Sequence, residues 1–300
     1  MGQHVSGPVV APAESNALTE LIPDQYECVD TDIEVAFGHI TRVELPGRGR
    51  SGGISPSVTA LTYLVTLDLS GNGLTGNFPL ALSRLKRLSS LDLSNNRLQG
   101  DVPPAIGLCT SLTLLHLHQN SFSGALPEAL GQLQRLQSLS LEYNSFSGPL
   151  PAGLFTLREL RRLNLRANCF YGDLSPSIGR LTRLSFFSVR NNRFHGAIPE
   201  SLGACTRLTF LNLSSNLFTG AVPDALAQLQ RLEHLYLFEN DLEGVVPSVI
   251  HELPLLKELD ARRNPRLLEA PCPMARAPVH VPRGLERANV AAFVLPLPAS

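Results

Sequence analysis

Asparagine recurs at every twenty-fourth position through most of this 300-residue chain. The residues concerned are Asn72, Asn96, Asn120, Asn144, Asn168, Asn192, Asn216, Asn240 and Asn264. A fixed period of about 20 to 50 residues indicates a stacked-repeat architecture, in which each unit contacts its neighbours and cannot bury its apolar side alone. We therefore expect an elongated stack of coils with a long exposed face, rather than a globule built around one pocket.

The apolar residues follow the same period. Leucine stands eight residues before every asparagine of the series, from Leu64 to Leu256, and apolar residues, mostly leucine, stand five and three residues before it. Since residues two apart on a strand point to the same side, this pair predicts a short strand with one buried face. Phenylalanine two residues after the asparagine predicts a stack of rings, formed by Phe122, Phe146, Phe170, Phe194 and Phe218.

Turn-forming residues complete each repeat. Glycine stands four residues after the asparagine, from Gly76 to Gly244, and proline stands seven residues after it in all of these repeats except the one with Ser175. Glycine tolerates strained backbone and proline fixes φ, so the two together predict a tight turn. We expect the asparagine to be buried, with its carbonyl and amide groups satisfying backbone groups of neighbouring loops.

These motifs resemble a known family. The string LTYLVTLDLSGNGLTGNFPLALSRLKRL is similar to the plant-type extracellular leucine-rich repeat, LxxLxxLxLxxNxLxGxIPxxLxxL, and the pattern covers residues 42–264. The segment ITRVELPGRGRSGGISPSVTALTYLVTLDLSGN resembles the first repeats of plant receptor-kinase ectodomains of the phytosulfokine and sulfated-peptide receptor type. The resemblance implies an α/β leucine-rich repeat solenoid, a right-handed curved superhelix of about ten 24-residue coils with a concave parallel sheet. It also implies a second, weaker strand after each asparagine.

The unbroken register predicts a single repeat domain. We expect a loose N-terminal leader and degenerate cap over residues 1–41, the repeat domain over residues 42–264, and a partial cap with a proline-rich flexible tail over residues 265–300. Cys109 and Cys205 occupy a column that otherwise holds leucine, which predicts buried thiols. Cys28 and Cys272 lie outside opposite ends of the repeats, too far apart to pair, so no disulfide framework is indicated.

Charge and termini bear on partners and compartment. The net charge is −1 and no basic tract is present, so we expect no nucleic-acid partner. The family lies at the cell surface, yet this chain shows neither a secretory signal nor a transmembrane segment and as written would be cytoplasmic. The start MGQHVS fits N-myristoylation at Gly2, and one acyl chain gives marginal membrane binding. A glycosylation sequon begins at Asn212 and is usable only if the chain is secreted.

Side chains six, four, two and one residues before each asparagine should face outward from the sheet. They are bland in the first, second and seventh coils, whereas coils three to six and eight carry histidine, arginine, aromatic and acidic residues. Because aromatic residues and arginine dominate binding energy at interfaces, this contrast favours ligand recognition over a solvated face that has drifted. The candidate ligand-binding residues are His116, His118, Glu142, Tyr143, Arg162, Arg166, Phe186, Arg190, His234, Tyr236, Phe238 and Glu239.

The arginines of this face suggest an anionic group. Arg166 and Arg190 share one column on neighbouring strands, where their guanidinium groups repel unless a carboxylate or sulfate lies between them. Glu142, in the same column, could itself neutralise Arg166. The resemblance to peptide-binding receptors favours an anionic group on an extended peptide.

Catalysis and metal binding are weaker interpretations. Asp92, His116 and Ser140 follow the order of a catalytic triad, but an open sheet offers no oxyanion hole. His116, His118 and Glu142 are possible metal ligands, although two histidines on a polar strand are more often simply exposed. We therefore expect no enzyme activity, no metal and no cofactor.

The sequence predicts a non-catalytic module that binds a peptide or protein ligand on the concave face. A receptor-like signalling or defence role, with a co-receptor or kinase partner, is what the resemblance implies. Two alternatives stay open: an inhibitor of a secreted enzyme, similar to polygalacturonase inhibitors, and an intracellular scaffold tethered through Gly2.

Overall fold

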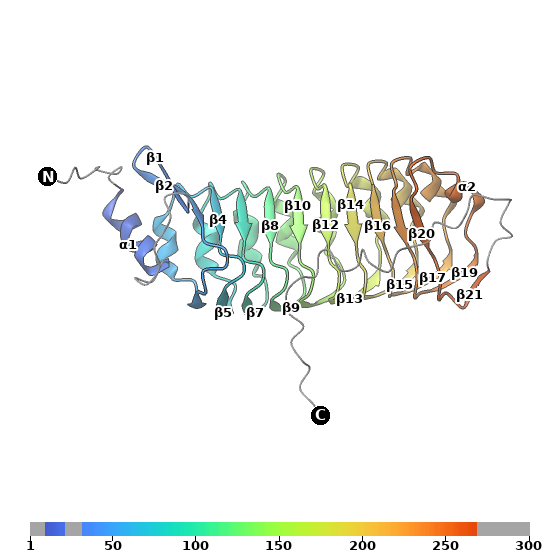
Figure 1. The fold of residues 1–300 in the computed structure, drawn as a ribbon, viewed down its shortest axis with the longest axis horizontal. Coiled ribbons are helices and arrows are strands. Elements are labelled where there is room, and N and C mark those ends of the chain that lie inside the picture. Colours follow the sequence, from blue (N-terminus) through green and yellow to red (C-terminus); the bar gives the residue numbers. More distant parts are fainter. Residues whose placement is uncertain (1–9, 22–31, 269–300) are drawn as a thin grey trace, which may run out of the picture. The chain divides into compact units, whose positions relative to one another are not determined.

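The computed structural model describes residues 10–21 and 32–268 (Figure 1). The predictions that concern Gly2, Cys28 and Cys272 lie outside these residues. Among the helices of the described segments, none has both the length and the apolar character needed to cross a membrane.

A sheet of eleven strands runs along one side of the repeat unit and is called the long sheet (Figure 1). Its first two strands pair antiparallel, and every later strand pairs parallel with the strand 24 residues away, so that Leu139 aligns with Leu163 and Leu163 with Phe187. In order, the strands are β1 (Ile33–Ala36), β2 (His39–Glu44), β4 (Thr66–Asp68), β6 (Ser90–Asp92), β8 (Leu114–His116), β10 (Ser138–Ser140), β12 (Arg162–Asn164), β14 (Phe186–Ser188), β16 (Phe210–Asn212), β18 (His234–Tyr236) and β20 (Glu258–Asp260).

A second sheet of ten strands follows the asparagine column, as the resemblance implied. Apart from β3, which follows Arg48, each strand comes after the asparagine of its coil, and neighbouring strands pair parallel. The strands are β3 (Ser51–Gly52), β5 (Gly73–Asn77), β7 (Arg97–Gly100), β9 (Ser121–Gly124), β11 (Ser145–Gly148), β13 (Cys169–Asp173), β15 (Arg193–Ala197), β17 (Leu217–Ala221), β19 (Asp241–Val245) and β21 (Arg266–Leu268).

A short helix returns each coil to the long sheet. Most of these helices begin directly after the proline column, with a proline such as Pro79 at the N-cap. Ser175, the exception in that column, caps its helix by accepting a hydrogen bond from the Ser177 amide at 3.2 Å, with Pro176 in the first turn. The helices are η1 (Pro56–Ala60), η2 (Leu80–Arg84), η3 (Pro104–Leu108), η4 (Glu128–Gln132), η5 (Ala152–Thr156), η6 (Pro176–Arg180), η7 (Glu200–Ala204), η8 (Asp224–Gln228) and α2 (Ser248–His251).

The core consists of the apolar columns identified in the sequence. Leucines of the strand pair, such as Leu163 and Leu165, are 0% exposed. The predicted phenylalanine stack is confirmed: ring centroids lie 6.0 to 6.3 Å apart from Phe122 to Phe218, and consecutive rings are inclined by 22° or less. Each coil therefore covers the apolar face of the next, which explains why one repeat cannot fold alone.

The two cysteines in the leucine column are buried, as predicted. The Cys109 Sγ contacts the Leu82 carbonyl and the Cys205 Sγ contacts the Ile178 carbonyl, each at 3.4 Å. Burial raises the pKa of the Cys109 thiol to about 11 and that of Cys205 to about 12. Because the thiolate is the reactive form, these residues act as small core side chains.

The asparagine column forms a continuous hydrogen-bonded ladder. The Nδ2 of Asn192 donates to the carbonyls of Leu165 and Val189, both at 2.9 Å, and its Oδ1 accepts from the Phe170 amide at 3.0 Å. Two of these partners belong to the preceding coil and one to its own. The same pattern repeats from Asn72 to Asn264, so one side chain per coil satisfies buried backbone groups in two coils.

Helix α1 (Pro12–Leu21) binds the hairpin β1–β2 that begins the long sheet. In this helix, Glu14 is 4% exposed and accepts hydrogen bonds from the Ile40 amide at 2.8 Å and from the His39 ring at 2.7 Å. The sequence predicted no element here, because ten residues without a repeat partner carry no periodic signal. A buried carboxylate is stable only when it is hydrogen-bonded, and the hairpin β1–β2 supplies the donors.

Replacement of one asparagine should destabilise the whole stack. In Asn192→Ala the Phe170 amide loses its acceptor, whereas the carbonyls of Leu165 and Val189 each lose one of two asparagine donors and keep the other. We therefore expect the free energy of unfolding to fall by about 1–3 kcal/mol. Urea denaturation measures this value, and Arg193→Ala, an exposed neighbour, is the control. A loss below about 0.5 kcal/mol would show that the ladder contributes little.

Helix α1 should depend on its buried carboxylate. In Glu14→Ala the Ile40 amide loses its acceptor, so we expect hydrogen exchange of residues 12–21 to accelerate about tenfold or more while the central coils stay protected. Exchange followed by mass spectrometry gives the comparison, with Thr19→Ala on the exposed side of the same helix as control. Unchanged protection in Glu14→Ala would rule out this role.

Candidate functional site

The first polar group on the long sheet is the histidine cluster, formed by Asp92, His116, His118, Ser138 and Glu142 on strands β6, β8 and β10 and the loops that follow them. The His116 ring bridges two strands, with Nδ1 3.2 Å from Asp92 Oδ2 and Nε2 2.9 Å from Ser138 Oγ. The His118 ring lies edge-on to it at 5.8 Å. The period of the repeat therefore brings together residues 24 positions apart.

Two groups of this cluster, Asp92 and His118, have a pKa below the usual value. Desolvation opposes ionisation of Asp92, but hydrogen bonds from His116 and Ser94 outweigh it and hold the pKa of the carboxyl below its usual range. Desolvation also lowers the pKa of His118, with Glu142 and Asp92 acting in the opposite direction. The His118 Nδ1 and the Glu142 Oε2 are buried without a hydrogen-bond partner in the described structure. Two unsatisfied polar atoms on a strand face favour a ligand or water that supplies them.

The hydrogen-bonded serine is Ser138, not the Ser140 that shares a column with Asp92 and His116. Ser140 is 3% exposed, whereas the Ser138 hydroxyl accepts from or donates to the His116 ring. The amides of Gln137 and Ser138 are both bound to the Thr113 carbonyl, so neither is free to hold an oxyanion beside this hydroxyl. Within the residues that the structure describes, no cluster of three or more metal-ligand side chains is found.

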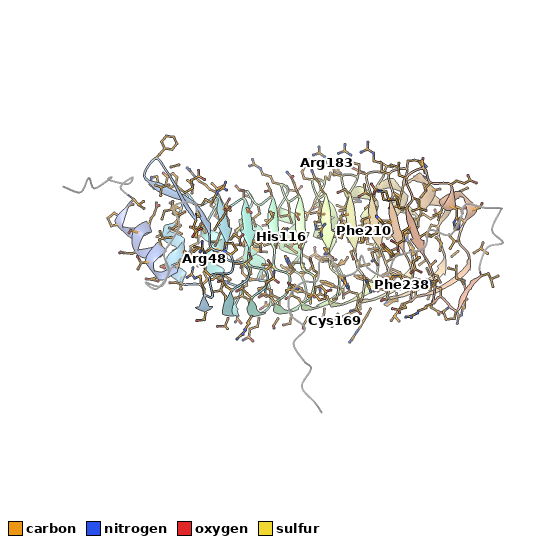
Figure 2. All side chains as sticks on the ribbon, viewed as in Figure 1. Arg48, His116, Cys169, Arg183, Phe210 and Phe238 are labelled. Carbon is orange, nitrogen blue, oxygen red and sulfur yellow. The ribbon has the colours of Figure 1, made fainter. Side chains whose placement is uncertain are left out.

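The second group is the aromatic patch, formed by Phe186, Phe210, His234, Tyr236 and Phe238 on and after β14, β16 and β18 (Figure 2). Phe186 and Phe210 stack at 4.6 Å between centroids with 4° between their planes. Phe210 also lies 6.0 Å from His234 and 5.6 Å from Tyr236, and Tyr236 meets Phe238 edge-on at 6.4 Å. Phe210 is therefore the centre of the patch.

Arginines cover the outer rings. The guanidinium carbon of Arg162 lies 3.9 Å from the Phe186 centroid, and that of Arg190 lies 5.2 Å from the Phe238 centroid. The Arg166 guanidinium carbon lies 5.2 Å from the centroid of the Tyr143 ring. Among the described side chains no ion pair joins Arg166 to Glu142, so the alternative in which Glu142 neutralises it is not favoured. Cation–π contacts hold the three arginines over the aromatic rings of this face.

The last two predicted residues, Tyr143 and Glu239, follow strands β10 and β18. Glu239 accepts a hydrogen bond from Ser215 at 2.8 Å and pairs with Arg263, and these contacts keep the pKa of its carboxyl below the usual range. Tyr143 and Glu239 both stand one residue before the asparagine, where φ is +56°. This left-handed backbone ends the strand and turns these side chains to the rim of the face rather than onto the strand itself.

Two residues depart from the sequence interpretation. Asn212 is 6% exposed, and its Oδ1 accepts from the Ser214 amide at 3.1 Å and hydroxyl at 2.6 Å, so this side chain closes a turn and is not presented for glycosylation. Phe210 was assigned to a bland coil, yet it contacts three other aromatic residues. Its position in the same column as Phe186 and His234 was the signal for this role.

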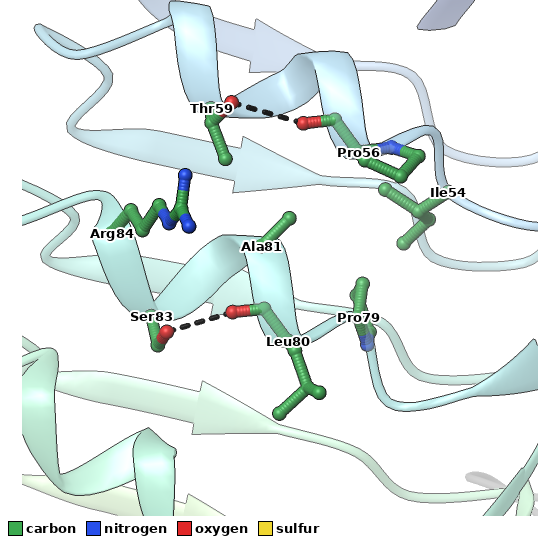
Figure 3. Close-up of a pocket in the computed structure, with 8 residues that line it drawn as sticks. All are labelled: Ile54, Pro56, Thr59, Pro79, Leu80, Ala81, Ser83 and Arg84. Atoms are coloured by element: carbon green, nitrogen blue, oxygen red, sulfur yellow. Dashed lines mark hydrogen bonds between the residues drawn. The ribbon is translucent and has the colours of Figure 1, made fainter.

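A depression of about 490 Å³ lies between η1 and η2, away from the predicted face (Figure 3). Thr59 and Ser83 in its wall bind the helix carbonyls of Pro56 and Leu80 at 3.0 and 2.7 Å. Arg84 is the charged residue of its lining. Because its hydroxyl groups are already engaged, this depression offers little for specific recognition.

Comparison with protein families agrees with this geometry. The family model for the leucine-rich repeat matches residues 62–122, 110–170, 180–242 and 206–265, which together are well over half of the chain. The chain belongs to the leucine-rich repeat family. The expected right-handed solenoid with a concave parallel sheet is thereby confirmed. A search of curated proteins found no match.

Solved structures give more specific likenesses. The chain is 36% identical to the ectodomain of the Arabidopsis thaliana membrane receptor kinase GASSHO1/SCHENGEN3, solved with CASPARIAN STRIP INTEGRITY FACTOR 2, over 73% of this chain and 26% of that one, with a TM-score of 0.71. It is 32% identical to the Arabidopsis receptor kinase HAESA, solved with the peptide hormone IDA and the co-receptor SERK1, over 75% and 37%, with a TM-score of 0.66. This chain thus spans about a quarter to two fifths of the length of these relatives.

A third likeness concerns the fold alone. A plant ice-binding protein is 22% identical over 90% of this chain and 99% of its own, with a TM-score of 0.65. At that identity the shared solenoid says nothing about ligand, since one fold hosts many functions.

Acid should destabilise the protein partly through His118. Because the pKa of His118 is lowered in the folded state, the unfolded chain takes up a proton first as pH falls through about 6.5, and stability is lost from there down to the folded-state pKa. We expect the Tm of His118→Gln to fall less than that of the unmodified protein when the pH is lowered from 7.5 to 5. Differential scanning calorimetry measures the shift, and the exposed His251→Gln is the control. Equal losses in all three proteins would contradict this assignment.

Proposed function

We propose that this protein is a non-catalytic recognition module that binds an extended peptide across strands β8 to β18 of the long sheet. The observation that carries the proposal is the partly exposed aromatic patch centred on Phe210, with rings 4.6 to 6.4 Å apart and arginines over its outer members. Parallel strands about 4.8 Å apart make this face roughly 24 Å long, a length that suits an extended chain of several residues.

The chemistry of the face indicates what such a peptide carries. Stacked rings on β14, β16 and β18 accept an apolar or aromatic side chain, because buried aromatic contacts supply most of the energy of such interfaces. Arg166 and Arg190 occupy one column on neighbouring coils, and their guanidinium groups match a carboxylate or sulfate. The unsatisfied His118 Nδ1 and Glu142 Oε2 add a hydrogen-bonding position at the other end.

Relatives support this choice of ligand. HAESA was solved with a peptide hormone, and GASSHO1/SCHENGEN3 with a named integrity factor, and each is at least 32% identical to this chain over about three quarters of its length. By extension we propose a receptor-like role in plant signalling or defence, in which a co-receptor or kinase partner joins the ligand-bound face. The relatives are much longer, so this wider role rests on the likeness and not on the site.

A peptide library tests the binding face directly. The immobilised protein would select from a phage-displayed library of random peptides, and an enriched peptide would then be synthesised. We expect Phe210→Ala to weaken its binding about 10- to 100-fold, because the substitution removes the central ring of the patch. Phe37→Ala is the matched control, since Phe37 is fully exposed at the tip of the β1–β2 turn.

Charge in the peptide is tested in the same assay. We expect Arg190→Ala to weaken binding of the acidic form of the peptide and to leave binding of its amidated, neutral form unchanged. Two results would place the ligand elsewhere. One is that Phe37→Ala and Phe210→Ala weaken binding of the selected peptide equally, and the other is that both variants bind it as tightly as the unmodified protein.

A further inference from the structure

A second surface is strongly charged and plays no part in the proposed peptide site. It follows the loops that precede the strands of the long sheet, and Arg183 at the upper border of Figure 2 belongs to it. We call it the basic edge, and its residues in the second to eighth coils are Arg84, Lys86, Arg87, Arg135, Arg158, Arg161, Arg180, Arg183, Arg207 and Arg231. All of them are exposed, and the acidic residues at the same positions in these coils are Glu159 and Glu233. Since the whole chain has a net charge of −1, the excess is local.

The few carboxylates at this edge are already engaged. Glu159 pairs with Arg183 of the next coil, and Glu233 pairs with Lys257 at 2.5 Å. Arg87 lies over the Tyr63 ring at 4.2 Å. Within residues 32–268, no ion pair is formed by the remaining arginines of the edge, which are Arg84, Arg135, Arg158, Arg161, Arg180, Arg207 and Arg231.

The fold fixes the spacing of these charges. Arg183, Arg207 and Arg231 occupy one column on three consecutive coils. Beside them, the Thr209 amide binds the Ser185 carbonyl and the Glu233 amide binds the Thr209 carbonyl, both at 2.8 Å, which holds the coils in register. The arginines therefore recur about every 4.8 Å along a line, and like charges held so close repel unless anions lie between them.

We propose that the basic edge binds a linear polyuronate, a polysaccharide with a carboxylate on every sugar unit. The Arg183–Glu159 pair shows that a carboxylate bridging two coils of this column is bound by the guanidinium group. A polymer with one carboxylate per sugar repeats that contact from coil to coil, at an interval comparable to the coil spacing. Its binding releases condensed counterions, and the guanidinium fork matches the carboxylate better than an ammonium group does. A line of cations one coil apart fits a linear anion better than a plane of lipid headgroups.

Binding of a fluorescently labelled polygalacturonate oligomer tests this inference on the full chain. The informative variant is Arg207→Gln with Arg231→Gln, and the matched control is Arg97→Gln with Arg193→Gln, which removes the same charge from exposed positions of the second sheet. We expect the first pair to weaken binding roughly tenfold and to reduce its dependence on NaCl concentration, and the control pair to leave both unchanged. A fully methyl-esterified oligomer of the same length should not bind.

Several results would overturn the proposal. The first is an equal loss of oligomer binding in both variant pairs. The second is that the esterified oligomer binds as tightly as the unesterified one, and the third is that polygalacturonate does not bind at low salt. Duplex DNA or phosphatidylserine vesicles that bind more tightly than the oligomer would assign the edge to another partner. Phe210→Ala should bind the oligomer normally, and the edge variant should bind the selected peptide normally, so this inference and the proposed function fail separately.

Discussion

The asparagine ladder is the interaction on which the rest of the structure depends. Each coil turns sharply after its strand, and this turn buries carbonyl and amide groups away from water. One asparagine side chain, such as Asn192, satisfies groups in its own coil and in the preceding one. Because an unsatisfied buried polar group is costly, the asparagine cannot be exchanged for an apolar residue of similar size. The ladder thereby sets both the turn and the register between coils.

That register converts a sequence column into a line of side chains in space. The phenylalanines from Phe122 to Phe218 become a buried stack, and residues on the strands become an exposed face. The same rule separates two surfaces with different chemistry. Aromatic rings gather on the long sheet around Phe210, whereas arginines such as Arg207 and Arg231 gather on the loops that precede it. A rigid scaffold can therefore change either surface without altering its core.

Outward direction alone does not decide which residues are available to a ligand. Asn212 faces away from the core, yet it closes a turn through Ser214. Asp92 belongs to the same column and binds the Ser94 amide at 2.9 Å. The aspartates and asparagines of this column therefore hold the end of their strands by accepting from the backbone amide two residues on. Phe186 and Phe210 carry no polar group that could take this role, and their rings stack on the face instead.

The sequence by itself determined the period, the buried columns, the strands of the long sheet and the face on which variable residues stand, because each of these follows from a spacing that repeats along the chain. The second sheet was expected from the family resemblance. Only the tertiary structure decided which side chains meet across strands. His116 binds Ser138, Arg166 lies over Tyr143, and Phe210 joins the aromatic patch. These contacts depend on side-chain reach and rotamer, which the spacing of residues does not encode. The cap around Glu14 occurs once in the chain, so no repeating pattern predicts it. Its stability comes from the hydrogen-bond donors of another segment, His39 and Ile40.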